Sequence, residues 1–420
     1  MTELQMQLKW LTAAETHHPP PKLNKDTLMN DGRFLQPCDW TFPVPIFYGP
    51  GRIREVAKLC KARGLRNPLI VTDRASRDLG FVDQILQTLD DHELNGGVFC
   101  DVSPNPTDQD IAKGRDVFRQ GDHDSVIALG GGSGMDAGKA ISLVARTDHS
   151  LWAFDYDGRD IPDLRAADFP PVMCIPTTAG TGAETESTAM VTDTAALTKR
   201  CVWHPAQKPF AVILDPSLTI GLPKNLTAWT GCDALVHAIE AYTVDALHPM
   251  CDGAALEGLS LISQHLPRVL VKPDDIAARG AMLIGSCLAG VGFLKGLGLV
   301  HSISHMIGAE YNSHHGLTNA VLLPVVLRFN QSRIAAKIAP MAQAMGLDRH
   351  DFDSFMTAIN AILDLCEIPE GLSSLGVQPS AIPRLASKAF GDAATSTNPR
   401  SATVNEIAHL IEQAMENSRA

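Results

Sequence analysis

Hydrophobic residues in the first half of the chain fall into short runs that alternate with helical patterns. Between residues 45 and 215, the apolar runs that read as buried strands are 67–73, 98–100, 125–129, 172–176 and 211–215. The stretches 82–89 and 111–120 carry apolar residues at helical spacing. Strands that alternate with helices form a parallel sheet covered on both faces. The pattern predicts an α/β, Rossmann-like domain whose ligand site lies beyond the carboxyl ends of the strands.

The pattern changes after residue 215. Residues 220–415 contain almost no alternating strand pattern, and helical spacing recurs over 225–242, 254–266, 277–294, 333–345, 353–365 and 405–415. We therefore expect an α/β domain over residues 41–215 and an all-α domain over residues 216–420. Residues 1–40 are polar and bear several prolines, so we expect an extended N-terminal arm there.

The composition excludes several classes of protein. A chain of 420 residues exceeds one ordinary core, which also favours two domains. The net charge is −12 and the chain has no basic block, which argues against nucleic acid or an anionic membrane as partner. Nine scattered cysteines form no CxxC pair and indicate free thiols in a reducing cytosol. We expect a cytoplasmic protein.

One segment, residues 281–300, has about the length and apolar character of a membrane span. Lys295 interrupts it, five glycines lie within it, and a histidine cluster follows at once. A helix that is apolar on all sides is also typical of a protein interior. We interpret this segment as a buried helix.

A glycine-rich loop follows the apolar run 125–129. Gly130, Gly131, Gly132 and Ser133 precede an expected helix, so a ligand could approach the backbone closely and free N–H groups could attract a pyrophosphate. Met135 stands where the usual G-x-G-x-x-G fingerprint has its third glycine. The loop therefore indicates phosphate binding better than an ordinary Rossmann site. Taken alone, it is also compatible with a tight strand–helix turn.

Two further loops carry polar groups that suit a cofactor. Asp73 ends an early strand, where a carboxylate can accept hydrogen bonds from an adenosine ribose, which favours NAD over NADP. Arg74 beside it weakens this inference, and Asp73 could instead be a helix N-cap. The threonine-rich residues 176–184 follow the next strand after the glycine loop and form a candidate cofactor wall, although they could equally be a capped loop.

Two helical pairs at i, i+4 spacing suggest a metal site. Asp233 and His237 form one pair and His301 and His305 the other, and His314 and His315 follow shortly afterwards. A single helical histidine is usually satisfied within the core. Two such pairs and a further histidine suit a divalent ion with mixed nitrogen and oxygen ligands. Spacing does not say which histidines bind the ion.

Together these motifs resemble the iron-dependent (group III) alcohol dehydrogenase family. The resemblance runs from about Phe42 to Ala414 and keeps the family's order of motifs. The matching motifs are Tyr48-Gly49-Pro50-Gly51, Pro104-Asn105-Pro106-Thr107, Gly130-Gly131-Gly132-Ser133-x-x-Asp136-x-x-Lys139, Gly231-x-Asp233-Ala-Leu-x-His237-Ala-Ile-Glu240, His301-x-x-x-His305, His315-Gly316 and Asn398-Pro399-Arg400.

The resemblance implies roles for individual residues. The implied cofactor contacts are Asp73, Asn105, Gly131, Gly132, Ser133, Asp136, Thr177, Thr178, Thr181 and Lys199. The implied metal ligands are Asp233, His237, His301 and His315, and His305 is an unligated active-site histidine. The implied ion is Fe²⁺, although mixed His/Asp ligands also suit Zn²⁺. The family also implies a homodimer or higher homo-oligomer.

The expected activity is reversible hydride transfer between a small alcohol and NAD, which gives an aldehyde or ketone. The ion would lower the pKa of the substrate hydroxyl, and His305 would relay its proton to solvent. One rival interpretation is a cyclase of the dehydroquinate-synthase type, which should need a basic cluster for a phosphorylated substrate; none lies near residues 296–316. The second rival interpretation is a non-catalytic protein that binds metal or nucleotide. The sequence does not indicate which alcohol is used.

Overall fold

The computed structural model describes residues 38–40, 44–158, 160–196 and 198–419. The predicted N-terminal arm, residues 1–40, lies outside the described residues except for Cys38–Trp40, which form a short strand. The α/β region and the helical region both belong to one compact unit, Phe34–Ala420. The division into two domains near residue 216 therefore stays a prediction.

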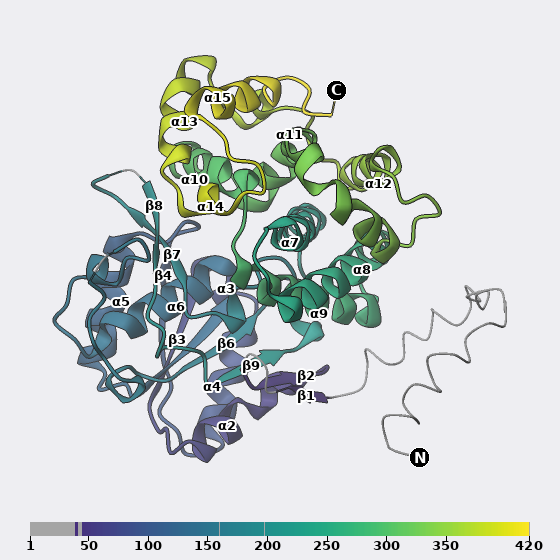
Figure 1. The fold of residues 1–420 in the computed structure, drawn as a ribbon. Helices are drawn as coiled ribbons and strands as arrows, with labels where there is room; N and C mark the ends of the chain where they lie inside the picture. Colours follow the sequence, from purple (N-terminus) through teal and green to yellow (C-terminus); the bar gives the residue numbers. More distant parts are fainter. Residues whose placement is uncertain (1–37, 41–43, 159, 197, 420) are drawn as a thin grey trace, which may run out of the picture. The chain divides into compact units, whose positions relative to one another are not determined.

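A seven-stranded sheet forms the centre of the first region (Figure 1). Its strands are β1 (Cys38–Trp40), β2 (Ile46–Tyr48), β3 (Pro68–Asp73), β4 (Gly97–Val102), β5 (Ser125–Gly130), β6 (Val172–Pro176) and β9 (Ala211–Leu214). They lie in the order β1-β2-β9-β6-β5-β3-β4, and every pair is parallel except β1 with β2. The predicted parallel sheet is confirmed.

Alternate residues of the strands pack on opposite faces of this sheet. Leu69 and Val71 of β3 belong to the core that includes α5 (Asp108–Gln120) and α6 (Gly132–Ala145). Ile70 belongs to the core that includes α2 (Val56–Ala62) and α4 (Phe81–Asp90). Both faces are covered, which is why these strands read as continuous apolar runs. The predicted helices 82–89 and 111–120 correspond to α4 and α5.

The second region is helical, as predicted (Figure 1). Its helices are α7 (Lys224–Thr243), α8 (Pro249–Val271), α9 (Ile276–Gly292), α10 (Leu299–Tyr311), α11 (His315–Ala344), α12 (Phe352–Leu365), α13 (Ile382–Phe390), α14 (Ala393–Thr397) and α15 (Val404–Gln413). Among the described residues, one helical segment, Ile276–Lys295, is long and apolar enough to cross a membrane. Of its apolar 18-residue stretch, 78% is buried inside the protein. A buried helix was predicted over residues 281–300; the structure confirms the buried helix but ends it near Lys295, and α10 begins at Leu299.

The sequence-based boundaries differ from the structure in several places. The helix expected at 333–345 is the last part of a longer helix, α11, which begins at His315 and continues through Pro324. The sequence did not predict the ribbon of β7 (Ala189–Asp193) and β8 (Thr198–Val202), whose polar residues hide the strand pattern. The short helix α3 (Arg74–Arg77) was also missed.

Candidate metal centre and cofactor cleft

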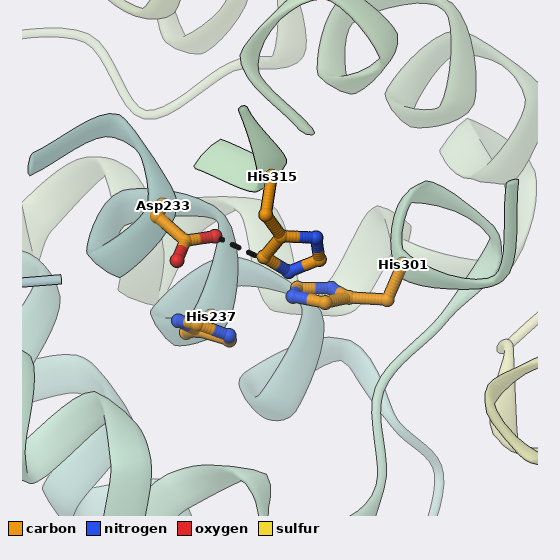
Figure 2. A group of neighbouring side chains, drawn as sticks. All are labelled: Asp233, His237, His301 and His315. Atoms are coloured by element: carbon orange, nitrogen blue, oxygen red, sulfur yellow. Dashed lines mark ion pairs between the residues drawn. The ribbon is translucent and has the colours of Figure 1, made fainter. Parts of the chain in front are cut away.

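Three helices bring the predicted metal ligands together. Asp233 and His237 lie one turn apart on α7, His301 lies on α10, and His315 is the first residue of α11. Each offers one ligand atom, and these atoms all lie within 4.8 Å of one another. Figure 2 shows the four side chains pointing toward one another. The structure therefore gathers all four into one group.

The approach of α11 to α7 depends on a glycine. A Cβ atom at Gly316 would lie 2.3 Å from the carbonyl oxygen of Trp229 and 2.8 Å from Cβ of Asp233, so a larger residue would push the helices apart. This contact places His315 in the ligand group. The neighbouring His314 instead packs its ring against Trp229, with centroids 5.0 Å apart.

The protonation of this group suits a cation. Asp233, His237 and His301 are buried, and His315 is partly buried. Burial holds the pKa of His301 and that of His315 well below the ordinary histidine value. Nearby histidines lower both pKa values further, whereas the carboxylates of Asp233 and Asp392 oppose the shift at His301. Neutral imidazoles with free lone pairs are the form that binds metal ions.

The surroundings of the group show that its lone pairs converge. The buried amide nitrogen Nδ2 of Asn319 lies 2.7 Å from Oδ1 of Asp233, 3.2 Å from Nε2 of His301 and 3.1 Å from Nε2 of His315. Three acceptors aimed at one electropositive group, with a fourth ligand beside them, fit a divalent ion. A set of three imidazoles and one carboxylate suits Fe²⁺ or Zn²⁺.

His305 lies one helical turn beyond His301 and is not in the ligand group. Its Nδ1 lies 2.9 Å from Oδ2 of Asp392, the N-cap residue of α14. Burial alone would raise the pKa of Asp392, but the charge and hydrogen bond of His305 and the N–H of Ala394 together hold it below its usual value. The pair leaves Nε2 of His305 for proton exchange. Sequence reasoning missed Asp392, because it lies 87 positions from His305.

All the predicted site residues line one cleft of about 1600 Å³. From the α/β region these are Asp73, Asn105, Gly131, Gly132, Ser133, Asp136, Thr177, Thr178, Thr181 and Lys199. From the helical region they are Asp233, His237, His301, His305 and His315. The cleft is large enough for a dinucleotide and a small substrate.

The glycine loop has the geometry of a phosphate-binding turn. β5 ends at Gly130, whose positive φ of 134° is a conformation that glycine adopts readily and other residues rarely do. α6 begins at Gly132 with no side chain capping its start. A Cβ at Gly132 would lie 2.9 Å from Cγ2 of Thr181, so the loop and the threonine wall are in close contact. The buried hydroxyl of Thr178 has no hydrogen-bond partner among the described residues. Free N–H groups and an unpaired hydroxyl in one wall fit a cofactor.

Other predicted cofactor residues have structural partners as well. Asp73 is the N-cap of α3, with Oδ1 2.9 Å from the Ser76 nitrogen and Oδ2 2.7 Å from its hydroxyl. The N-cap alternative is confirmed, and the contact of Asp73 with a cofactor ribose stays a prediction. Arg74 forms an ion pair with Asp101. Asp136 accepts a hydrogen bond from the Met190 nitrogen at 3.2 Å.

One hydrogen bond between cleft residues connects the two regions. Asn105 follows β4, and its Nδ2 donates a hydrogen bond to Oδ1 of Asn312 at 2.7 Å. Asn312 ends α10 in the left-handed conformation, just before the ligand His315. Lys199 lies on β8, where burial lowers its pKa while the charges of Asp136 and Asp233 act in the opposite direction. The charge of Lys199 thus interacts with Asp136, next to the glycine loop, and with Asp233 of the ligand group.

The sequence did not single out Glu186, a carboxylate in the wall of the cleft. Its side chain is 3% exposed, and Oε1 accepts a hydrogen bond from the Thr185 hydroxyl at 3.2 Å. Burial raises the pKa of Glu186 to about 7, although the charges of Lys208 and Lys139 oppose the shift. Between about pH 4.5 and about pH 7, the folded protein therefore holds a proton on Glu186 that the unfolded chain releases.

We expect Glu186→Gln to change how stability depends on pH. A raised pKa means that the contribution of Glu186 to stability is fully present below about pH 4.5 and is lost as the pH rises toward 7. Between about pH 5 and about pH 8 the variant should therefore lose about 1–3 kcal/mol less stability than the wild type. Urea unfolding of both proteins at the two pH values measures this difference. The contributions of the other titrating groups cancel, because both proteins contain them. Identical pH dependence would contradict the prediction.

Comparison with known proteins agrees with the geometry. The sequence model "Iron-containing alcohol dehydrogenase" matches residues 43–216, and the model "Fe-containing alcohol dehydrogenase family, C-terminal" matches residues 227–415. The chain is 38% identical to an NAD-dependent methanol dehydrogenase of Bacillus methanolicus, over 89% of this chain and 98% of the relative. It is 36% identical to a 1,3-propanediol dehydrogenase of Citrobacter freundii, over 90% and 98%.

Solved structures agree with this assignment. The crystal structure of a 1,3-propanediol oxidoreductase superposes with a TM-score of 0.83 at 34% identity, over 91% of this chain and all of that one. The matches cover both the α/β region and the helical region, so they include every motif that lines the cleft. The chain therefore belongs to the iron-containing alcohol dehydrogenase family, whose members are oxidoreductases that act on CH–OH groups.

Proposed function

We propose that this chain catalyses reversible hydride transfer between a small alcohol and NAD, with an aldehyde or ketone as the product of oxidation. The observation that carries the proposal is one cleft that holds both the four converging ligand atoms and the glycine loop. Fe²⁺, as the family name indicates, would be held by Asp233, His237, His301 and His315. NAD would lie along the loops of the α/β region.

The residues around the cleft have separate tasks in this reaction. When bound, the ion supplies a Lewis acid for the substrate oxygen, and the nicotinamide ring supplies the hydride acceptor. His305 takes up the hydroxyl proton at Nε2, and Asp392 holds the ring through Nδ1 and stabilises its charged form. Thr178 and the N–H groups at the start of α6 orient the cofactor from the opposite wall. Asn105 and Asn312 hold the two walls together.

The proposal is tested by NADH absorbance with a panel of small alcohols, diols and hydroxy acids. The protein is loaded with Fe²⁺ or Zn²⁺ before the assay. NADH formation that requires both the ion and an alcohol supports the proposal. Tight binding of NAD and metal without NADH formation from any alcohol would favour a non-catalytic binding protein instead.

Asp73 should set the preference for NAD over NADP. We expect Asp73→Ser to lower the ratio of kcat/KM for NAD to kcat/KM for NADP by roughly tenfold to a hundredfold, because a charge-assisted hydrogen bond to the ribose and the repulsion of a 2′-phosphate are both lost. Serine is also a good N-cap, so the contact with Ser76 that starts α3 is kept. An unchanged melting temperature is therefore the control, and an unchanged cofactor ratio would contradict the role of Asp73.

We also propose that the protein is a cytoplasmic homodimer or higher homo-oligomer with two domains that meet near residue 216. The eight cysteines whose side chains the structure describes are all free, which suits a reducing compartment. β1 lies at an edge of the sheet, where a second chain could pair with it. The two family models divide between residues 216 and 227. Size-exclusion chromatography with light scattering measures the oligomeric state.

A further inference from the structure

The helix that carries His301 and His305 begins without a capping side chain of its own. The first N–H groups of a helix have no partner within the helix. At the start of α10 they are bound by residues from distant parts of the chain. The Gly298 nitrogen lies 3.0 Å from Oε2 of Glu240, and the Val300 nitrogen lies 2.9 Å from Oε1 of the same residue. The Leu299 nitrogen lies 3.1 Å from Oδ1 of Asn398.

The carboxylate of Glu240 also binds the ligand histidine. Nδ1 of His301 lies 2.6 Å from Oε2 of Glu240, and both side chains are buried. A ring that donates from Nδ1 keeps its lone pair on Nε2. Nε2 is the atom that faces Asn319 and the ligand group. One side chain therefore contacts both the backbone start of α10 and the ring of its first histidine.

The packing around Glu240 leaves little freedom for this arrangement. A Cβ atom at Gly298 would lie 2.6 Å from Oε1 of Glu240 and 2.7 Å from Oδ1 of Asn398, so glycine is required there. Asn398 is itself held by Asn330 through bonds of 3.0 and 2.8 Å. Two of its partners are backbone N–H groups, which can only donate, so both oxygens of Glu240 act as acceptors.

We propose that Glu240 is a positioning residue that fixes the start of α10 and the ring tautomer of His301, and thereby sets the affinity of the centre for its ion. This inference rests on the proposed function, because it needs the ligand group to bind a metal. Carboxylate partners of metal-binding histidines hold the ring in place and increase its basicity. A negative charge at the N-terminus of α10 also stabilises that helix.

The test compares Glu240→Gln with the wild type, both loaded with Co²⁺ as a visible probe. Glutamine has one acceptor oxygen for three donors, so the ring of His301 is released. We expect Co²⁺ affinity, measured by chelator competition, to fall about 10- to 100-fold. The visible absorption of bound Co²⁺ should change as well, because the geometry of one ligand changes. A role in folding alone would not move either readout in protein that remains folded.

Asp215→Asn is the matched control. Asp215 is also fully buried, and its two oxygens accept hydrogen bonds from the Gly51 and Ile53 nitrogens, both at 3.0 Å. It does not contact the histidine cluster. We expect this variant to lose stability while Co²⁺ affinity and the Co²⁺ spectrum stay at wild-type values.

The outcomes separate the inference from the proposed function. Wild-type protein that binds no Co²⁺ would overturn both. Wild-type protein that binds Co²⁺, together with a Glu240→Gln variant of equal affinity and unchanged spectrum, would overturn the role of Glu240 alone. If the variant does not fold, ¹⁵N-histidine NMR of the Zn²⁺-loaded wild type decides. A Nδ1–H resonance that disappears in His301→Ala supports the role, and the absence of such a resonance overturns it.

Discussion

Replacing His301 with alanine is expected to lower bound iron by about tenfold or more and to lower kcat/KM by about a thousandfold. The substitution removes one of four ligand atoms from a buried group that lies within 4.8 Å, and the remaining donors cannot close around the ion. A metal Lewis acid contributes several kcal/mol to stabilisation of the transition state. A loss of about 4 kcal/mol corresponds to roughly a thousandfold in rate. Iron content by elemental analysis and NADH-coupled kinetics measure the two effects.

His265→Ala is the control for this experiment. His265 is also a buried histidine on a long helix, α8, and its Nδ1 lies 2.9 Å from the carbonyl oxygen of Leu261. It does not belong to the ligand group, so we expect the variant to keep its iron while it loses stability. His301→Ala protein that keeps both iron and turnover would contradict the metal assignment.

Five of the seven strands of the sheet were predictable as apolar runs, whereas β1 and β2 were not predicted. Strands such as β5 and β6 are wholly buried, and each was recognised as an apolar run close to its observed bounds. The ribbon of β7 and β8 was not recognised, since β8 contains Lys199 and Arg200 and its middle residues are only partly buried. Arg200 is held in place by Asp155 and Asp193, contacts that no local pattern contains.

The start of α11 shows a different limit. Pro324 in the sequence argues for a helix that ends before it, yet the structure continues the helix from His315 through this residue. At this end α11 packs closely on α7 through Gly316, a tertiary contact that helical spacing cannot report.

The candidate site was likewise predictable only where the signal lies within one helix. Spacing within one helix identified Asp233 with His237 and His301 with His305, because residues four apart share a face. Spacing did not choose between His314 and His315, and the resemblance to the family supplied that choice. Asn319 and Asp392 had no signal of their own, and Glu240 appeared only as the last residue of the first metal motif, with no role given to it. Each of the three contacts a histidine that a different helix presents.

Replacing His305 with asparagine is expected to lower kcat by about 10²- to 10⁴-fold near neutral pH while iron content stays at the wild-type value. His305 is outside the ligand group, so the substitution leaves all four proposed ligands in place. Asparagine can still hydrogen-bond to Asp392 but cannot carry a proton, and a positioned acid–base group contributes about this factor. Steady-state kinetics with an alcohol and NAD, together with elemental analysis, measure both quantities.

Asp392→Asn should have the same direction with a smaller effect, about tenfold, because the ring of His305 stays while its charged form loses a carboxylate 2.9 Å away. Added imidazole distinguishes proton transfer from positioning. A free imidazole can replace the missing base of His305→Asn, so its rate should rise with imidazole concentration, whereas the rate of His301→Ala should not, because the ion is absent there. Full turnover by His305→Asn would mean that His305 has no part in the reaction. A loss of iron from His305→Asn equal to that from His301→Ala would mean that His305 belongs to the metal centre.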